Sequence, residues 1–332
     1  MKIVRRRVVG SRGPESALPV MKPCYVVVCL ALFASVLVPT ARTETTEVID
    51  RAQMARDQTV SPLTGTATSS GEPVLVTSPN DADLGEQEIL RRTKTYQPFV
   101  ASVAVPIYWT SNVALTNSGE QDDLLISPVA AVAYQPRMTR NLSGYISVRD
   151  QQFYYSRLTD FDFGSFDTEV GLTYTVRQVY NLVLRAGYDY NRLTDKNSFH
   201  DFFSNHILVL SAELPMPITR SQQISVGMDA NISLGATPDL PRRHDFDTFV
   251  GYSVQLTRAF VVSASGRLAI HDYTDSDRLD VSELVALNAT YSLTRLLSAS
   301  ALTSFGANQS NQSVFDYQVV NAGGTIAFTL RF

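Results

Sequence analysis

Apolar and polar residues alternate along the chain from residue 97 onward, in segments of about ten to fourteen residues. The segment after Arg220 shows two interleaved sets, Ile224, Val226, Met228, Ala230 and Ile232 on the one hand, and Gln223, Ser225, Gly227, Asp229 and Asn231 on the other. Successive side chains of a β-strand point to opposite faces. The pattern therefore predicts strands that have one apolar face and one polar face.

Short polar turns that contain an arginine separate these segments in pairs. They are Met138-Thr139-Arg140, Thr175-Val176-Arg177, Ile218-Thr219-Arg220, Leu256-Thr257-Arg258 and Leu293-Thr294-Arg295, and the arginines recur at intervals of 37 to 43 residues. Longer polar stretches alternate with the short turns, at residues 160–165, 191–201, 235–245, 272–280 and 308–316. This order predicts hairpins that are joined by longer loops.

The five turns give ten strands between residues 123 and about 307, and one more strand is predicted on each side, at 99–108 and 317–332. Soluble sandwiches also contain alternating strands. Here, however, short and long turns alternate strictly, as they do in membrane barrels, and strands of about ten residues can cross a bilayer when tilted. An open sheet edge is not tolerated in lipid. We therefore predict an all-β fold, a closed antiparallel transmembrane β-barrel of about 12 strands over residues 97–332, with both chain ends on the periplasmic side.

Aromatic residues gather near the predicted strand ends. Near the longer loops lie Phe153, Tyr154, Tyr155, Tyr188, Tyr190, Phe199, Phe202, Phe203, Phe246 and Tyr273, and near the short turns lie Tyr134, Tyr174, Tyr180 and Tyr291. Membrane barrels carry aromatic girdles at both interfaces. We interpret the two groups as these girdles.

The last strand places Ile326, Phe328, Leu330 and the terminal Phe332 on one face. This ending resembles the C-terminal signal of Gram-negative outer-membrane proteins, which the barrel assembly machinery recognises during insertion. The layout of residues 98–332 is similar to that of porin-like barrels, although it indicates no individual family. The resemblance implies an outer-membrane location, with membrane lipid and the assembly machinery as partners.

The N-terminal region has a different character. The apolar run at residues 25–38 is shorter than the roughly 20 residues that a transmembrane helix needs, and it has the length of a signal-peptide core. We predict a signal peptide over residues 1–42, whose start is either Met1 or Met21; an uncleaved anchor is the alternative. Cys24 and Cys29 both lie in this segment, so the mature chain would have no cysteine.

Residues 43–96 show no sustained period and contain Thr, Ser, Gly and Pro-rich patches beside an acidic stretch. Such a composition predicts a disordered or loosely structured periplasmic segment. Three roles stay open for it: binding a periplasmic partner, entering the lumen as a plug, or none.

The polar strand face predicts which residues line the lumen. The charged candidates for solute selectivity are Arg149, Glu169, Arg185, Asp189, Glu213, Asp229, Asp247 and Arg267. Charged residues make up only 18% of the chain, aromatics make up 10%, and the net charge is −4. This balance suits a membrane barrel and gives no indication of nucleic-acid binding. Mixed charge in the lumen argues against strong ion selectivity.

These features favour a channel for the passive or weakly selective diffusion of small solutes, with no catalytic residues, no cofactor and no metal. The alternatives are a closed structural barrel that anchors a partner or forms a polymer exit port and, less favoured, a barrel hydrolase. No histidine has a serine two residues later, as outer-membrane phospholipases require. The dipeptides His200-Asp201, His244-Asp245 and His271-Asp272 resemble part of an omptin-type site, but adjacent strand residues point to opposite faces.

Overall fold

The computed structural model describes residues 49–52, 96–196 and 200–332. The predicted signal peptide and most of the 43–96 segment lie outside these residues and stay predictions. Among the described residues, no helix is long and apolar enough to cross a membrane.

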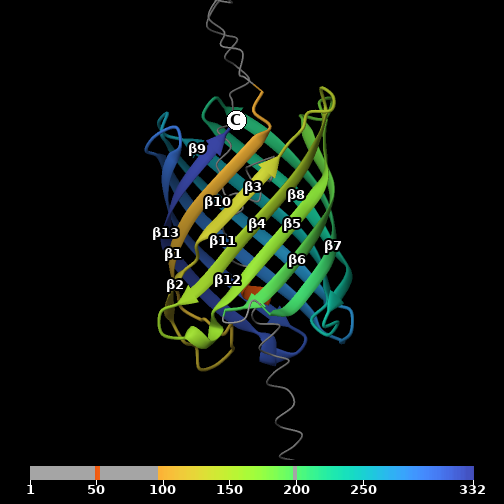
Figure 1. Cartoon of the computed structure of the whole chain (residues 1–332), viewed down its shortest axis with the longest axis vertical. Coiled ribbons are helices and arrows are strands. Elements are labelled where there is room, and N and C mark those ends of the chain that lie inside the picture. The colour runs from red at the N-terminus through yellow and green to blue at the C-terminus, as the bar shows by residue number, and fades with distance from the viewer. Residues whose placement is uncertain (1–48, 53–95, 197–199) are drawn as a thin grey trace, which may run out of the picture. The chain divides into compact units, whose positions relative to one another are not determined.

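One antiparallel sheet contains all the strands that the structure describes (Figure 1). The strands are β1 (Phe99–Thr110), β2 (Asp123–Ile126), β3 (Val129–Tyr134), β4 (Leu142–Tyr155), β5 (Phe163–Val176), β6 (Leu182–Asp195), β7 (Asp201–Thr219), β8 (Gln222–Thr237), β9 (Arg243–Gln255), β10 (Phe260–Tyr273), β11 (Leu279–Ser292), β12 (Leu297–Ser310) and β13 (Tyr317–Arg331). Two single 3-10 turns, η3 (Thr159–Phe161) and η4 (Ser313–Phe315), lie between strands.

The sheet closes on itself because β1 pairs with β13 along most of its length, from Val100↔Arg331 to Thr110↔Asn321. Strands β2 and β3 occupy one position between β1 and β4, and they keep the same register on both sides of Ser127 and Pro128. Pro128 has no N–H to donate, so the ladder is interrupted there without a shift. The barrel therefore has twelve strand positions, which confirms the prediction.

The five arginine turns all lie where they were predicted, between β3 and β4, β5 and β6, β7 and β8, β9 and β10, and β11 and β12. We call this end of the barrel the turn end and the opposite end the loop end. Strand β1 begins and strand β13 ends at the turn end. There the backbone N–H of Phe99 donates to the carbonyl of Phe332 (3.0 Å), and the N–H of Phe332 donates to the carbonyl of Phe99 (3.1 Å).

The strands at the loop end are longer than predicted. β6 continues to Asp195, β9 begins at Arg243 and β12 reaches Ser310, so most of the polar stretches assigned to loops belong partly to strands. Strands can pair through their backbones without an apolar face once they extend beyond the lipid. For this reason, hydrophobic alternation predicted strands that are too short at the loop end. The longest connection between described strands, residues 111–122, was not among the predicted loops, because it carries apolar residues that pack inward, such as Val113 (1% exposed) and Leu115 (4%).

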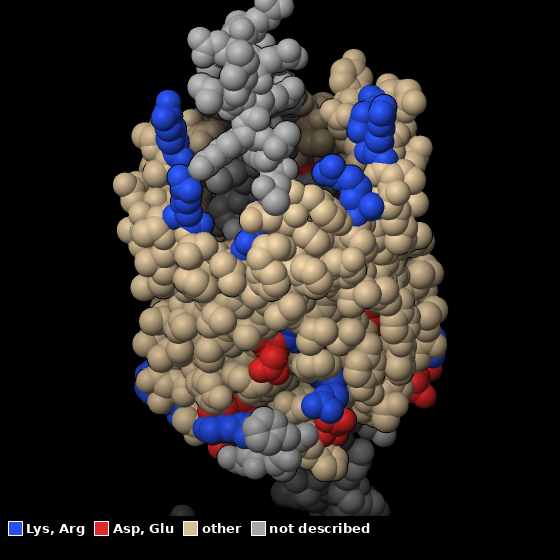
Figure 2. All heavy atoms as spheres, turned by 45° about the horizontal axis from the view of Figure 1, so that its top comes forward, with Lys and Arg blue, Asp and Glu red and all other residues tan. Residues whose placement is uncertain are grey.

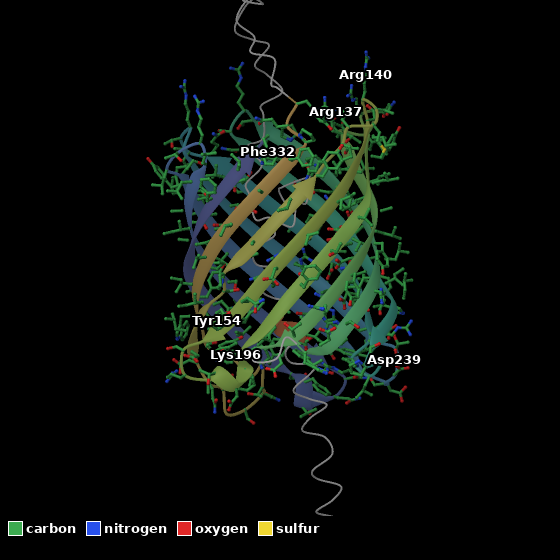
Figure 3. All side chains as sticks on the ribbon, in the orientation of Figure 1. Arg137, Arg140, Tyr154, Lys196, Asp239 and Phe332 are labelled. Atoms are coloured by element: carbon green, nitrogen blue, oxygen red, sulfur yellow. The ribbon has the colours of Figure 1, made fainter. Side chains whose placement is uncertain are left out.

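An exposed ring of arginines surrounds the turn end. Its members are Arg137, Arg140, Arg177, Arg220, Arg258, Arg295 and Arg331. The five short turns, which carry all of these arginines except Arg331, contain no Asp or Glu. Figure 2 shows basic side chains around this rim, and Figure 3 shows Arg137 and Arg140 at the end opposite to Lys196 and Asp239. We call this set the arginine ring.

The apolar strand face points outward, as predicted for a face in contact with lipid. Val103 (54% exposed), Val132 (57%) and Leu287 (52%) illustrate it. Part of the girdle interpretation is wrong, because Phe153, Tyr155, Phe203 and Tyr273 point into the barrel and are almost fully buried. Tyr154, Tyr188 and Phe246 do lie on the outer face of the loop end, and Tyr134, Tyr174 and Tyr291 lie on the outer face of the turn end. Phe199 lies outside the described residues.

Candidate functional site in the lumen

All eight residues that were predicted to line the lumen occupy inward-facing strand positions, between outward neighbours that are exposed or half-buried. They are Arg149 on β4, Glu169 on β5, Arg185 and Asp189 on β6, Glu213 on β7, Asp229 on β8, Asp247 on β9 and Arg267 on β10. Their part in selectivity is not decided by this placement and stays a prediction.

Carboxylates face each other directly on neighbouring strands in the middle of the wall. Asp229 and Asp247 are cross-strand partners of β8 and β9. The Arg267 Nη1 lies 3.4 Å from the Asp247 Oδ2, and the same guanidinium lies over the ring of Phe249 at 5.9 Å. Like charges placed opposite each other are unfavourable, so a cation beside them, here Arg267, reduces that cost.

A second pair of carboxylates, Glu169 and Asp189, faces across β5 and β6. The Tyr145 hydroxyl donates a hydrogen bond to Glu169 (2.7 Å), and the Arg185 guanidinium lies 5.3 Å from the centre of the Tyr145 ring. The Tyr145 side chain reaches from β4 across Gly171 of β5 to Gly187 of β6, and a Cβ at these glycines would come within 2.5 and 2.3 Å of the tyrosine oxygen. The two glycines therefore make room for the tyrosine side chain on the inner face.

Arg149 belongs to another contact. Its guanidinium donates to the Gln151 side chain, which in turn donates to the Ser127 hydroxyl at 2.6 Å. All three side chains are buried. These hydrogen bonds join Arg149 to the residue at which the β2–β3 strand is interrupted.

A charged cluster at the loop end was not predicted from the sequence. Arg243 Nε lies 2.8 Å from Asp245 Oδ1, and His271 Nδ1 lies 2.6 Å from the same oxygen. Arg278 donates through Nε to both oxygens of Asp280 (2.9 and 3.0 Å). The signal in the sequence is that each arginine stands two residues before an aspartate; within β9 this spacing places Arg243 and Asp245 on one strand face.

Residues 49–52 form one helical turn inside this end of the barrel, drawn in red in Figure 1. Asp50 forms ion pairs with Arg243 and with Arg278, the latter at 3.7 Å. The Arg51 guanidinium lies 4.5 Å from the ring centre of Phe161 and 5.9 Å from that of Tyr155. Of the three roles left open for the 43–96 segment, entry into the lumen is the one that these contacts favour for residues 49–52.

The loop between β1 and β2 carries an exposed ion pair. The Asp122 carboxylate accepts hydrogen bonds from the Trp109 indole (3.2 Å) and from Arg157 (3.1 Å). The hydrogen bonds from Trp109 and Arg157 lower the pKa of Asp122 below its ordinary value. This carboxylate is therefore charged at neutral pH and ties the loop to the segment after β4.

The described residues contain no group of three or more His, Cys, Asp or Glu side chains that is arranged to hold a metal ion. In the His244-Asp245 and His271-Asp272 dipeptides the two side chains point to opposite faces, because both lie within strands. His271 instead pairs with Asp245 on the neighbouring strand. A base of this kind needs a nucleophile within hydrogen-bonding reach to act in hydrolysis. Among the described residues, no serine or threonine hydroxyl is hydrogen-bonded to His271.

The predicted assembly signal lies on the outer face at the closure of the barrel. Ile326, Phe328 and Leu330 are exposed on β13, and Phe332 stacks on Phe99 with their ring centres 5.5 Å apart. Recognition of these residues by the assembly machinery stays a prediction.

No protein-family model and no curated protein sequence matches the chain. Among solved structures, the barrel is similar to the COG4313 outer membrane channel from Pseudomonas putida F1, with a TM-score of 0.50 and 9% identity over 71% of this chain and 96% of that one. The NanC porin (TM-score 0.41, 9% identity, 69% and 100% covered) and the KdgM porin (0.35, 9%, 68% and 98%) are more distant. The chain therefore has the fold of a Gram-negative outer-membrane β-barrel.

Proposed function

We propose that the protein is an outer-membrane channel through which small solutes diffuse passively, with a weak preference for cations. The observation that carries the proposal is a closed wall whose inner face presents acidic, basic and hydroxyl side chains through the middle of the barrel. A wall of twelve strands lies between the eight-stranded barrels that side chains fill and the larger ones that enclose water. The similarity to a solved outer-membrane channel supports the same class. Export through the predicted signal peptide and insertion by the assembly machinery belong to this proposal.

The preference for cations follows from the balance of charge in the predicted selectivity set. The arginines are Arg149, Arg185 and Arg267, and the carboxylates are Glu169, Asp189, Glu213, Asp229 and Asp247. Acidic rings favour cations in membrane pores. The effect is weak here because Arg267 lies beside Asp247, and because Arg185 lies over the ring of Tyr145, whose hydroxyl donates to Glu169.

The protein purified from outer membranes and reconstituted in planar bilayers would test this. We expect discrete conductance steps and, under a salt gradient, a reversal potential that indicates a modest preference for cations. Arg185→Glu and Arg267→Glu should each strengthen that preference, and Asp229→Asn should weaken it. Asp150→Asn, exposed on the outer face of β4, is the matched control. Unchanged reversal potentials in both arginine variants would remove these residues from the conduction path.

A closed barrel that anchors a partner is the second candidate. It is favoured by one observation, the filling of the loop end by residues 49–52 and by the inward-packed loop at 111–122. Electrical silence from a barrel that is shown to be folded would support this candidate over the channel.

A further inference from the structure

The helical turn at residues 49–52 occupies a site that its own contacts describe. Arg243 and Arg278 each form an ion pair with an aspartate on a strand, Asp245 and Asp280, and both also form an ion pair with Asp50. The side chains of the two arginines are 5% and 4% exposed. Asp50 itself is 10% exposed. The carboxylate of Asp50 therefore shows that this part of the lumen can bind a carboxylate group.

The two arginines are held in place without Asp50. Arg243 is fixed by Asp245 (2.8 Å) and donates to the Tyr273 hydroxyl at 2.9 Å. Arg278 is fixed by Asp280, and its guanidinium lies 3.6 Å from the ring centre of Phe315 and 4.2 Å from that of Tyr273. A guanidinium has five N–H donors, and its planar fork suits carboxylates. Both arginines therefore keep donors for a further carboxylate after the strand-borne aspartates are satisfied.

The other half of the site is apolar. Ala52 (2% exposed) packs in a cluster formed by inward side chains of several strands and of the loop at 111–122, and Ile49 packs against the same cluster. The buried members besides Ala52 are Val113, Leu125, Phe153, Tyr155, Phe163, Leu193, Phe203 and Ala236. These include the aromatic residues that would have belonged to the girdle had they pointed outward. Because the residues of this cluster line the lumen, they would shield from water any apolar group that binds next to the arginines.

We propose that the loop end of the lumen is a binding site for a carboxylate attached to an apolar body, and that the turn at residues 49–52 occupies this site in competition with such a solute. Arg243 and Arg278 bind the carboxylate, and the apolar cluster binds the attached chain or ring. A solute of this class displaces Asp50 and Ala52 together. This inference rests on the inner face of the barrel and goes beyond the proposed diffusion of small solutes.

A thiol introduced by Ala52→Cys would report whether the turn is seated. The full chain would carry Cys24→Ser and Cys29→Ser, so that the introduced thiol is the single one, and would be refolded in detergent micelles and reacted with a charged maleimide. Ser276→Cys, at an exposed loop position, is the matched control for reagent reactivity. Hexanoate is the probe, acetate has the same charge without the apolar body, and hexanamide has a similar chain without the charge.

We expect slow labelling at position 52 without a probe and a rise of about tenfold or more at saturating hexanoate, which corresponds to about 1.4 kcal/mol of lost seating free energy. Acetate should act only at much higher concentration, and hexanamide should have little effect. Asp50→Asn should speed labelling without any probe, and Arg243→Gln together with Arg278→Gln should do so and also abolish the response to hexanoate. Labelling at position 276 should stay constant throughout.

Two results would overturn the proposal. Slow labelling that hexanoate does not change would show a seated turn without a competing carboxylate site. Fast labelling of the parent that Asp50→Asn does not change would show that Asp50 does not hold the turn. Should the double arginine variant fail to fold, Asp50→Asn and the three probes still decide the question. Labelling requires no ion current, so its outcome is independent of whether the barrel conducts.

Discussion

The threonines of the short turns show what single residues contribute to the wall. The hydroxyl of Thr139 accepts hydrogen bonds from the N–H groups of Asn141 and Leu142, and that of Thr294 accepts from Leu296 and Leu297, at 3.0 to 3.3 Å. Thr219 and Thr257 each accept one such bond. The threonine therefore closes the turn, whereas the arginine beside it projects outward.

Thr294→Ala should lower the free energy of unfolding by about 0.5–1 kcal/mol, because two turn N–H groups lose their acceptor and water replaces it only in part. Thr294→Ser keeps the hydroxyl and should be close to the parent. Urea unfolding in lipid vesicles, followed by tryptophan fluorescence, measures both. An equal loss in the two variants would mean that the methyl group matters and the hydrogen bonds do not.

The contact of Tyr145 with Gly187 makes a second residue-scale test. Gly187→Ala puts a Cβ where the tyrosine oxygen lies, and we expect a loss of about 1–3 kcal/mol, typical of overpacking. In a Tyr145→Phe background the nearest atoms are farther away, at 3.1 and 3.3 Å, so the same substitution should cost less. A double-mutant cycle gives the coupling. Additive losses would contradict the contact, and Gly235→Ala, with open space around it, is the control.

At the scale of strands, hydrophobic alternation predicted the number, direction and inner faces of the strands because lipid on one side imposes the pattern on every residue pair. It could not predict the strand ends at the loop end. There, the strands contact water or the barrel's own loops, and the aromatic residues Phe153 and Tyr155 pack in an internal cluster. The break at Pro128 was also hidden, because the register continues across it.

The candidate site was predicted in part for the same reason. The residues in the middle of the wall follow from alternation, whereas the pairing of His271 with Asp245 depends on cross-strand register. The contact of Asp50 with Arg243 joins residues almost two hundred positions apart, and no period in the sequence relates them.

At the end of the last strand, the role of Phe332 in recognition by the assembly machinery can be tested separately from its packing in the folded barrel. Phe332 is 57% exposed and stacks on Phe99, so Phe332→Ala should cost the purified barrel less than about 1 kcal/mol, a fraction of what full burial of a phenylalanine contributes. If the terminal residue is part of the assembly signal, the amount of folded protein in outer membranes should fall several-fold. A matched Phe328→Ala variant extends the test to the neighbouring outward position. A large loss of stability in vitro would indicate that Phe332 acts by packing.

At the scale of the whole molecule, the wall and its contents have separable roles. None of the strand pairs of the closed ladder involves residues 49–52, so we expect the ladder to stay intact whether or not these residues are seated. Solute binding and barrel stability are therefore expected to respond to different substitutions.

The arginine ring gives the molecule a permanent electric dipole along the membrane normal. The opposite mouth carries exposed acidic residues, among them Glu120, Asp122, Asp160, Asp239, Asp275 and Asp277. A conducting pore with a negative and a positive mouth behaves as a diode, and current should be larger when cations enter from the loop end and anions from the turn end. Rectification should fade between 0.1 and 1 M salt, where the Debye length falls from about 10 Å to about 3 Å, and Arg258→Gln with Arg295→Gln should reduce it. The direction of rectification would then reveal which way round each inserted molecule lies.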